Sequence, residues 1–309
     1  MKIHVSKDWL HGIGEEEHSP LAGPLPDPAE FLCRSALEVS MADRLSGYAR
    51  ELLRRAWIED TDADDPESLR DQITLLLHRF PQTSPALLRG SLRQNVSDRA
   101  LDPRLTAWLA LLNTRSLEVD SEVKYEGIPV KEIRTIAKFS RDPKGPQRAV
   151  EFIRSMGVIV FVIKTIPGTG VDGCAFWSLA NRPVIGLSVR HDRLDNFWFS
   201  LLHECAHVAL HVRGPQDTFV DDLEGQVSKD EQEIEANLVA ADAAIPRLAW
   251  KRSQAMRFPS AYNIETLAAE VGVHPSIVAG RIQHESKNFS LFREFLGQGE
   301  VSKAFDLPS

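Results

Sequence analysis

The most constraining feature of this chain is an apolar helical segment, at about residues 195–212, that carries His203, Glu204 and His207. Aliphatic and aromatic residues surround these three polar side chains, which predicts that the helix is buried. Burying polar groups without a partner is energetically costly. The fold must therefore bring a common partner to this helix.

The spacing of the two histidines fits one metal ion. Residues four apart on a helix are separated by about 40° around its axis and about 6 Å along it. The imidazoles of His203 and His207 can therefore converge on one ion, and neutral imidazole is a good zinc ligand. Glu204 follows the first histidine directly, where it can take a proton from a water that zinc activates. The pattern predicts the zincin arrangement, with Zn²⁺ as cofactor and Glu204 as catalytic base.

A third ligand must come from elsewhere in the chain. His211 shares the face of the histidines but lies about 12 Å along the axis from His203, so we expect it to support or pack against the ligands. A downstream helix carries Glu233 and Glu235, and either carboxylate could bind. We prefer Glu233, because Asn237 lies four residues later on the same face and could orient a histidine. Glu235 points away from that face and is expected to be a solvated charge.

Hydrophobic spacing divides the chain into two regions. Residues 29–116 have a helical pattern and residues 118–125 form a polar linker. We therefore predict a mostly helical N-terminal domain at residues 1–125, without an assigned role, and a zinc metallopeptidase domain at residues 126–309. The second region begins with helical segments and continues with three short β-branched and aromatic runs. These predicted strands lie at residues 158–163, 174–179 and 183–189, the last two as a hairpin.

The predicted fold class is α+β, with a small sheet and the His-Glu-x-x-His helix in a zincin-like domain. After that helix we expect a loop of some 15 residues and then the helix of Glu233, which ends at Pro246. A helix-turn-helix-like segment follows at about residues 260–285, with Gly272 as its turn glycine. Its second helix contains a single base, Arg281, so we favour a packed helical pair over DNA recognition.

Composition narrows the class of protein. Lys and Arg number 36 and Asp and Glu 44, a net charge of −8 that disfavours a broad nucleic-acid-binding face. The three cysteines form no Cys-x-x-Cys pair, which fits a reducing compartment. No apolar run has signal-peptide or membrane-helix length. We therefore expect a cytoplasmic protein that does not contact membranes, and the sequence sets no oligomeric state.

The order of these elements resembles the ImmA/IrrE family of zinc metallo-endopeptidases over about residues 129–281. The stretches that carry the resemblance are RPVIGLSVRHDRLDNFWFSLLHECAHVALH and EIEANLVAADAAIP. Cys205 and Ala206 stand where members often have Leu and Gly, at positions that bind no metal. The resemblance implies a gluzincin-like fold with His203, His207 and Glu233 as zinc ligands and Glu204 as base.

The resemblance also implies a partner. Members of the family cleave helix-turn-helix repressors or antitoxins, which releases a stress, phage or mobile-element response. In zincins the strand before the active helix often pairs with extended substrate, so we expect residues 183–189 to bind the peptide backbone. The alternative is a DNA-binding regulator with a non-catalytic peptidase-like scaffold. The intact His-Glu-x-x-His pattern argues against this alternative, because a scaffold needs no base.

Overall fold

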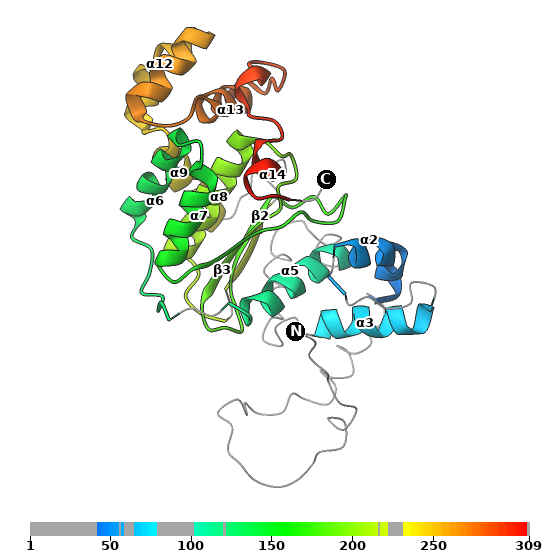
Figure 1. Cartoon of the computed structure of the whole chain (residues 1–309). Helices are drawn as coiled ribbons and strands as arrows, with labels where there is room; N and C mark the ends of the chain where they lie inside the picture. The colour runs from blue at the N-terminus through cyan, green and yellow to red at the C-terminus, as the bar shows by residue number, and fades with distance from the viewer. Residues whose placement is uncertain are drawn as a thin grey trace.

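A computed structural model describes residues 42–55, 57–58, 65–78, 102–119, 122–215, 217–221 and 231–307. The predictions for residues 1–41 and for the loop at residues 222–230 lie outside this part of the chain. Within it, helices surround a small mixed sheet, which confirms the α+β fold class (Figure 1).

The sheet has four strands in the order β1-β3-β2-β4. Strands β2 and β3 form the predicted antiparallel hairpin, β1 pairs with β3 in parallel, and β4 pairs antiparallel with β2. The four strands are β1 (Ile159–Val162), β2 (Gly173–Trp177), β3 (Pro183–Leu187) and β4 (Thr218–Asp221).

Two sequence predictions about the sheet are wrong. Strand β4 falls within the stretch that we predicted as a loop, because a run of four residues gives too little alternation to signal a strand. Strand β3 lies inside the sheet between β1 and β2, so both of its edges are already paired and it cannot bind an extended peptide. The edges of this sheet are β1 and β4.

Helices cover both faces of the sheet (Figure 1). Alternate strand residues enter two different hydrophobic cores, which explains why the strands are apolar along their whole length. Those in the core that contains the His-Glu-x-x-His helix are Val160, Ala175, Ile185 and Leu187. Those in the core that contains the N-terminal helices are Ile159, Cys174, Phe176 and Val184.

The first core positions the candidate site. Its central element is α8 (Leu194–Leu210), whose residues from His203 to Ala209 are all buried. Helix α8 packs against β2 and β3 on one side and against the later helix that carries Glu233 on the other. The helices around it are α6 (Val130–Lys138), α7 (Gly145–Ser155) and α9 (Glu231–Ala244), with a short 3-10 turn at Phe139–Arg141.

The N-terminal helices close the opposite face. Helix α5 meets β3 at Gly186, where an added Cβ atom would lie 3.1 Å from the ring of Trp108 and 2.9 Å from Cys174 Sγ. Asp102 accepts a hydrogen bond from the backbone of Arg104 and so caps α5. The described elements are a 3-10 turn (Ser46–Tyr48), α2 (Ala49–Arg54), α3 (Pro66–His78) and α5 (Pro103–Ser116).

The C-terminal segment has the expected helix, turn and helix. Gly272 adopts a left-handed conformation (φ 78°) at the end of α12, and His274 caps α13. Helix α13 packs against α8, and its residues Ile277–Ala279 are buried. The elements here are α10 (Arg247–Arg252), α11 (Gln254–Arg257), α12 (Ala261–Val271), α13 (Pro275–Ser286), a 3-10 turn (Arg293–Phe295) and α14 (Glu300–Ala304).

Arg281, the one Lys or Arg residue of α13, packs within the fold. The guanidinium of Arg281 lies 4.5 Å from the ring centre of Trp250 and donates to Glu285 at 2.9 Å. It also donates to the carbonyl oxygen of Ile245 at 3.3 Å, at the end of α9. These contacts favour the packed helical pair that the sequence suggested. Among the described helices, none combines the length and hydropathy needed to cross a membrane.

Candidate metal centre

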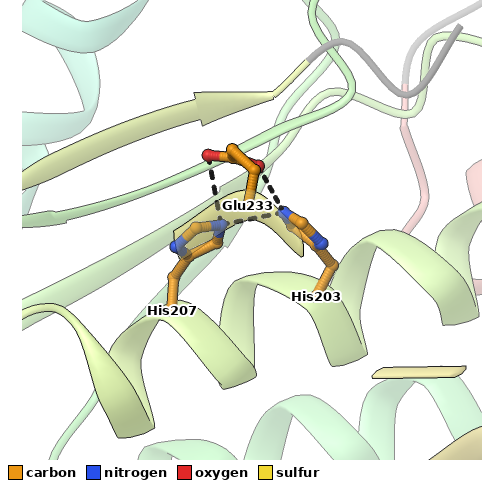
Figure 2. A group of neighbouring side chains, drawn as sticks. All are labelled: His203, His207 and Glu233. Carbon is orange, nitrogen blue, oxygen red and sulfur yellow. Dashed lines mark hydrogen bonds and ion pairs between the residues drawn. The ribbon is translucent and has the colours of Figure 1, made fainter. Parts of the chain in front are cut away.

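Three of the predicted site residues converge. His203 and His207 lie one turn apart on α8, and Glu233 reaches them from the first turn of α9 (Figure 2). The two Nε2 atoms are 2.9 Å apart, and the carboxylate oxygens of Glu233 lie 3.4 Å from each of them. Each residue offers one ligand atom, and these atoms all lie within 4.8 Å of one another.

This arrangement fits a metal ion. Ligand atoms at about 2.0–2.1 Å from zinc in a tetrahedron are about 3.3 Å apart. The two distances from Glu233 match this spacing, and the distance between the histidines is somewhat shorter. Both imidazoles are fully buried, and the side chain of Glu233 is 17% exposed. A cation between the three acceptors would offset the cost of burying them together.

The electrostatics of Glu233 support the same conclusion. Burial by itself raises the pKa of this carboxyl group, because it disfavours the charged form. Hydrogen bonds and charge from His203 and His207 outweigh burial and hold its pKa well below the usual range. Glu233 is therefore ionised at neutral pH, as a metal ligand must be.

Glu204 lies on the side of α8 that faces strand β2. Its carboxylate is buried and fills the place where Gly173 would carry a Cβ atom. A residue with any side chain at position 173 would collide with this carboxylate, so Gly173 makes room for the predicted base. The sequence does not signal the place of Gly173, because a single glycine at the start of a strand has no distinctive pattern.

The two cysteines near the site are poor ligand candidates. Burial raises the pKa of both the Cys174 and the Cys205 thiol, and the charge of Glu204 raises them further. Both side chains are fully buried and not paired in a disulfide. The thiolate form that binds metals is therefore disfavoured at both positions.

His211 lies directly behind His207. Its Nδ1 atom is 3.1 Å from Nδ1 of His207, and its Nε2 atom is 3.1 Å from a carboxylate oxygen of Glu235. This confirms the expected supporting place of His211. Glu235 is 59% exposed but is not simply a solvated charge, because it contacts His211.

The role predicted for Asn237, orienting a histidine, stays a prediction. The neighbour that the structure places at the outer nitrogen of His207 is His211, whose Nδ1 atom lies 3.1 Å from it. Glu233 and Asn237 share one face of α9 as expected.

Phe219 from strand β4 completes the surroundings of His207. Its ring stacks on the imidazole of His207 at a centroid distance of 4.3 Å and an interplanar angle of 23°. It also lies 5.5 Å from the ring of His211. This contact depends on β4, whose four residues do not signal a strand in the sequence.

Comparison with known proteins agrees with this geometry. Residues 156–283 match the model of Peptidase_M78, described as the IrrE N-terminal-like domain. The matched range begins just before β1 and contains His203, Glu204, His207 and Glu233. No curated protein and no solved structure gives a significant match. Residues 156–283 of this chain are therefore similar to the IrrE N-terminal-like domain, whose family is one of metallopeptidases.

Proposed function

We propose that this protein is a zinc-dependent endopeptidase with His203, His207 and Glu233 as metal ligands and Glu204 as catalytic base. The observation that carries the proposal is the convergence of two buried imidazoles and one ionised carboxylate within ligand distance. Two histidines and a glutamate are a ligand set of catalytic zinc sites, in which a fourth position stays open for water or substrate.

Each residue has a distinct task in this proposal. Zinc, when bound, supplies a Lewis acid and lowers the pKa of water at the site. Glu204 takes a proton from the attacking water and delivers it to the amine that leaves when the peptide bond breaks. Gly173 keeps the carboxylate of Glu204 against strand β2. The negative charge of Glu233 offsets part of the charge of the ion.

The substrate in this proposal is a protein that presents an extended segment. Strand β4 is an edge of the described sheet and lies beside His207 through Phe219. Backbone hydrogen bonds to such an edge bind a peptide with little demand on its sequence. Strand β4 therefore replaces β3 as the proposed binding strand.

The resemblance to ImmA/IrrE proteins supports a more specific substrate class. We propose that the protein cleaves a helix-turn-helix repressor or antitoxin in the cytoplasm and thereby switches on a stress, phage-defence or mobile-element response. The packing of Arg281 and α13 against the fold supports cleavage of a DNA-binding protein rather than direct DNA binding.

The test uses Glu204→Gln, which keeps the size of the side chain and removes the base. Metal analysis of purified protein should give about one zinc per chain for the wild type and for the variant. Cleavage of the helix-turn-helix protein encoded nearest to its gene should fall about 100-fold or more, the usual contribution of general acid–base catalysis. The control is Glu265→Gln, on the exposed side of α12, which should keep both zinc and cleavage.

Two outcomes would contradict the proposal. Full cleavage by Glu204→Gln would remove Glu204 from the role of base. A wild-type protein that binds no zinc would remove the metal centre, and with it the hydrolase.

A further inference from the structure

A series of side-chain contacts, His207–His211–Glu235, leads from the metal centre to the protein surface. It begins at the outer nitrogen of His207, passes through both nitrogens of His211 and ends at the carboxylate of Glu235. His207 is fully buried, His211 is 8% exposed and the side chain of Glu235 is 59% exposed. This series of contacts therefore runs from the buried interior to solvent in two steps.

We infer that His211 and Glu235 are positioning residues that hold the ligand His207 in its metal-binding tautomer and orientation. This inference rests on the proposed metal centre. It adds to that proposal a second pair of residues, neither of which touches the ion or the substrate.

The geometry permits one arrangement of protons when His207 binds a metal through Nε2. A neutral imidazole with a free Nε2 lone pair carries its proton on Nδ1. His207 Nδ1–H then donates to Nδ1 of His211, which must be the unprotonated nitrogen of that ring. The proton of His211 is consequently on Nε2, from which it donates to the carboxylate of Glu235. Each N–H donor in this series of contacts then has an acceptor, and the series ends on the carboxylate of Glu235, which only accepts.

A carboxylate at the end of such a chain is useful to a metal site. Metal-bound histidines usually donate their other N–H to a carboxylate or carbonyl, which fixes the ring and strengthens it as a ligand. Here a second histidine lies between ligand and carboxylate. His211 lies one turn beyond His207 and connects its Nδ1 atom to Glu235 on α9.

This series of contacts also connects α8 and α9, the two helices that supply the ligands. Glu233 and Glu235 are two residues apart in the first turns of α9, so the same short segment binds the centre and ends the chain. Phe219 lies against the rings of both His207 and His211 and restricts their rotation. A shift of α9 along α8 would break the contact with Glu235 and the convergence of Glu233 together.

The experiment measures zinc affinity by competition with a chromogenic chelator. His211→Phe keeps an aromatic ring and removes both nitrogens, and we expect it to weaken zinc binding about 10- to 100-fold. Glu235→Ala should weaken it in the same direction. His211→Gln offers an amide oxygen to His207 and an amide N–H to Glu235, so it should recover most of the lost affinity. The controls are His284→Phe on α13 and Glu231→Ala on α9, because both residues are exposed and neither belongs to the series of contacts.

A second readout reports the tautomer directly. Ring ¹⁵N chemical shifts of zinc-loaded wild-type protein should show His207 protonated at Nδ1 and His211 protonated at Nε2. Cobalt-substituted His211→Phe should have a visible absorption spectrum that differs from that of the wild type, because the His207 ring is free to tilt. A variant that merely packs worse would change the unfolding midpoint without changing these spectra.

The outcomes separate this inference from the proposed function. If the wild type binds zinc and the His211 and Glu235 variants bind it equally tightly, the positioning role is wrong and the endopeptidase proposal stands. The opposite protonation of the His211 ring would also overturn the positioning role. If the wild type binds no zinc, the proposed function itself fails.

Discussion

The carboxylate of Glu204 occupies the space in which a Cβ atom of Gly173 would lie, with its Cγ and Cδ atoms 3.0 Å from that position. Helix α8 and strand β2 thus pack closely at the proposed catalytic base. The backbone of Gly173, which carries no side chain, lies against this carboxylate. Position 173 should therefore affect catalysis more than it affects metal binding.

Gly173→Ala should lower kcat by at least about 10-fold while zinc content stays at the wild-type level. The added methyl group displaces the carboxylate of Glu204, and a misplacement of about 1 Å can cost a factor of about 100 in rate. Steady-state cleavage and metal analysis of the same preparation check this. Gly214→Ala is the control, since a Cβ atom there meets nothing within 4 Å. Unchanged kcat in Gly173→Ala would show that Glu204 moves freely or is not the base.

Removal of the metal should destabilise the wild-type protein. A ligand that binds only the native state adds about 2.7 kcal/mol when its concentration is 100 times its dissociation constant. Chelation should therefore lower the thermal unfolding midpoint of the wild type by several degrees. Glu233→Ala should show little response to chelator, because it lacks one of the three converging ligands. An equal response in both proteins would place the metal elsewhere.

Trp108→Ala should cost about 3–5 kcal/mol of unfolding free energy, the usual cost of truncating a buried large aromatic residue. Trp108 is fully buried in the core that α5 shares with β3. Chemical denaturation followed by circular dichroism and by zinc release should therefore report one coincident transition. Leu75→Ala on α3, where the side chain is 47% exposed, is the control and should cost much less. Two separate transitions would indicate that the N-terminal helices fold independently of the sheet.

Arg281→Ala should destabilise the protein by about 1–3 kcal/mol, because the guanidinium is stacked on Trp250 and bonded to Glu285 and to the end of α9. The midpoint of urea denaturation measures this loss. Arg257→Ala, an exposed arginine at the end of α11, should change it little. A stable Arg281→Ala variant with lost DNA binding would instead support the regulator alternative.

Glu51 should stabilise α2 in a pH-dependent way. Hydrogen bonds from Arg54 and Arg55 lower the pKa of Glu51 to about 2, against 4.5 in the unfolded chain. A lowered native pKa means that this stabilisation is complete above about pH 4.5 and is lost as the pH falls toward 2. Glu51→Gln should cost about 1 kcal/mol at pH 7, as expected for a partly exposed pair, and less than half of that at pH 3. Urea denaturation at the two pH values tests it; a pH-independent difference would contradict the assignment.

The residues of α8 were predictable because their relationship is local. The four-residue spacing of His203 and His207 places both rings on one face of any regular helix. The preference for Glu233 over Glu235 follows from helical phase in the same way, and the structure brings Glu233 to the histidines. The hairpin of β2 and β3 was also local, since a short link joins its two strands.

Contacts between distant segments were decided by the tertiary structure alone. The pairing of β1 with β3 places β3 inside the sheet, and nothing in either strand's composition specifies that neighbour. The contact between His211 and Glu235 joins residues 24 apart, and no local spacing on α8 or α9 specifies it. Glu235 contacts His211 because α9 packs against α8. Sequence periodicity determines which face of an element is apolar, whereas packing determines which neighbours that face meets.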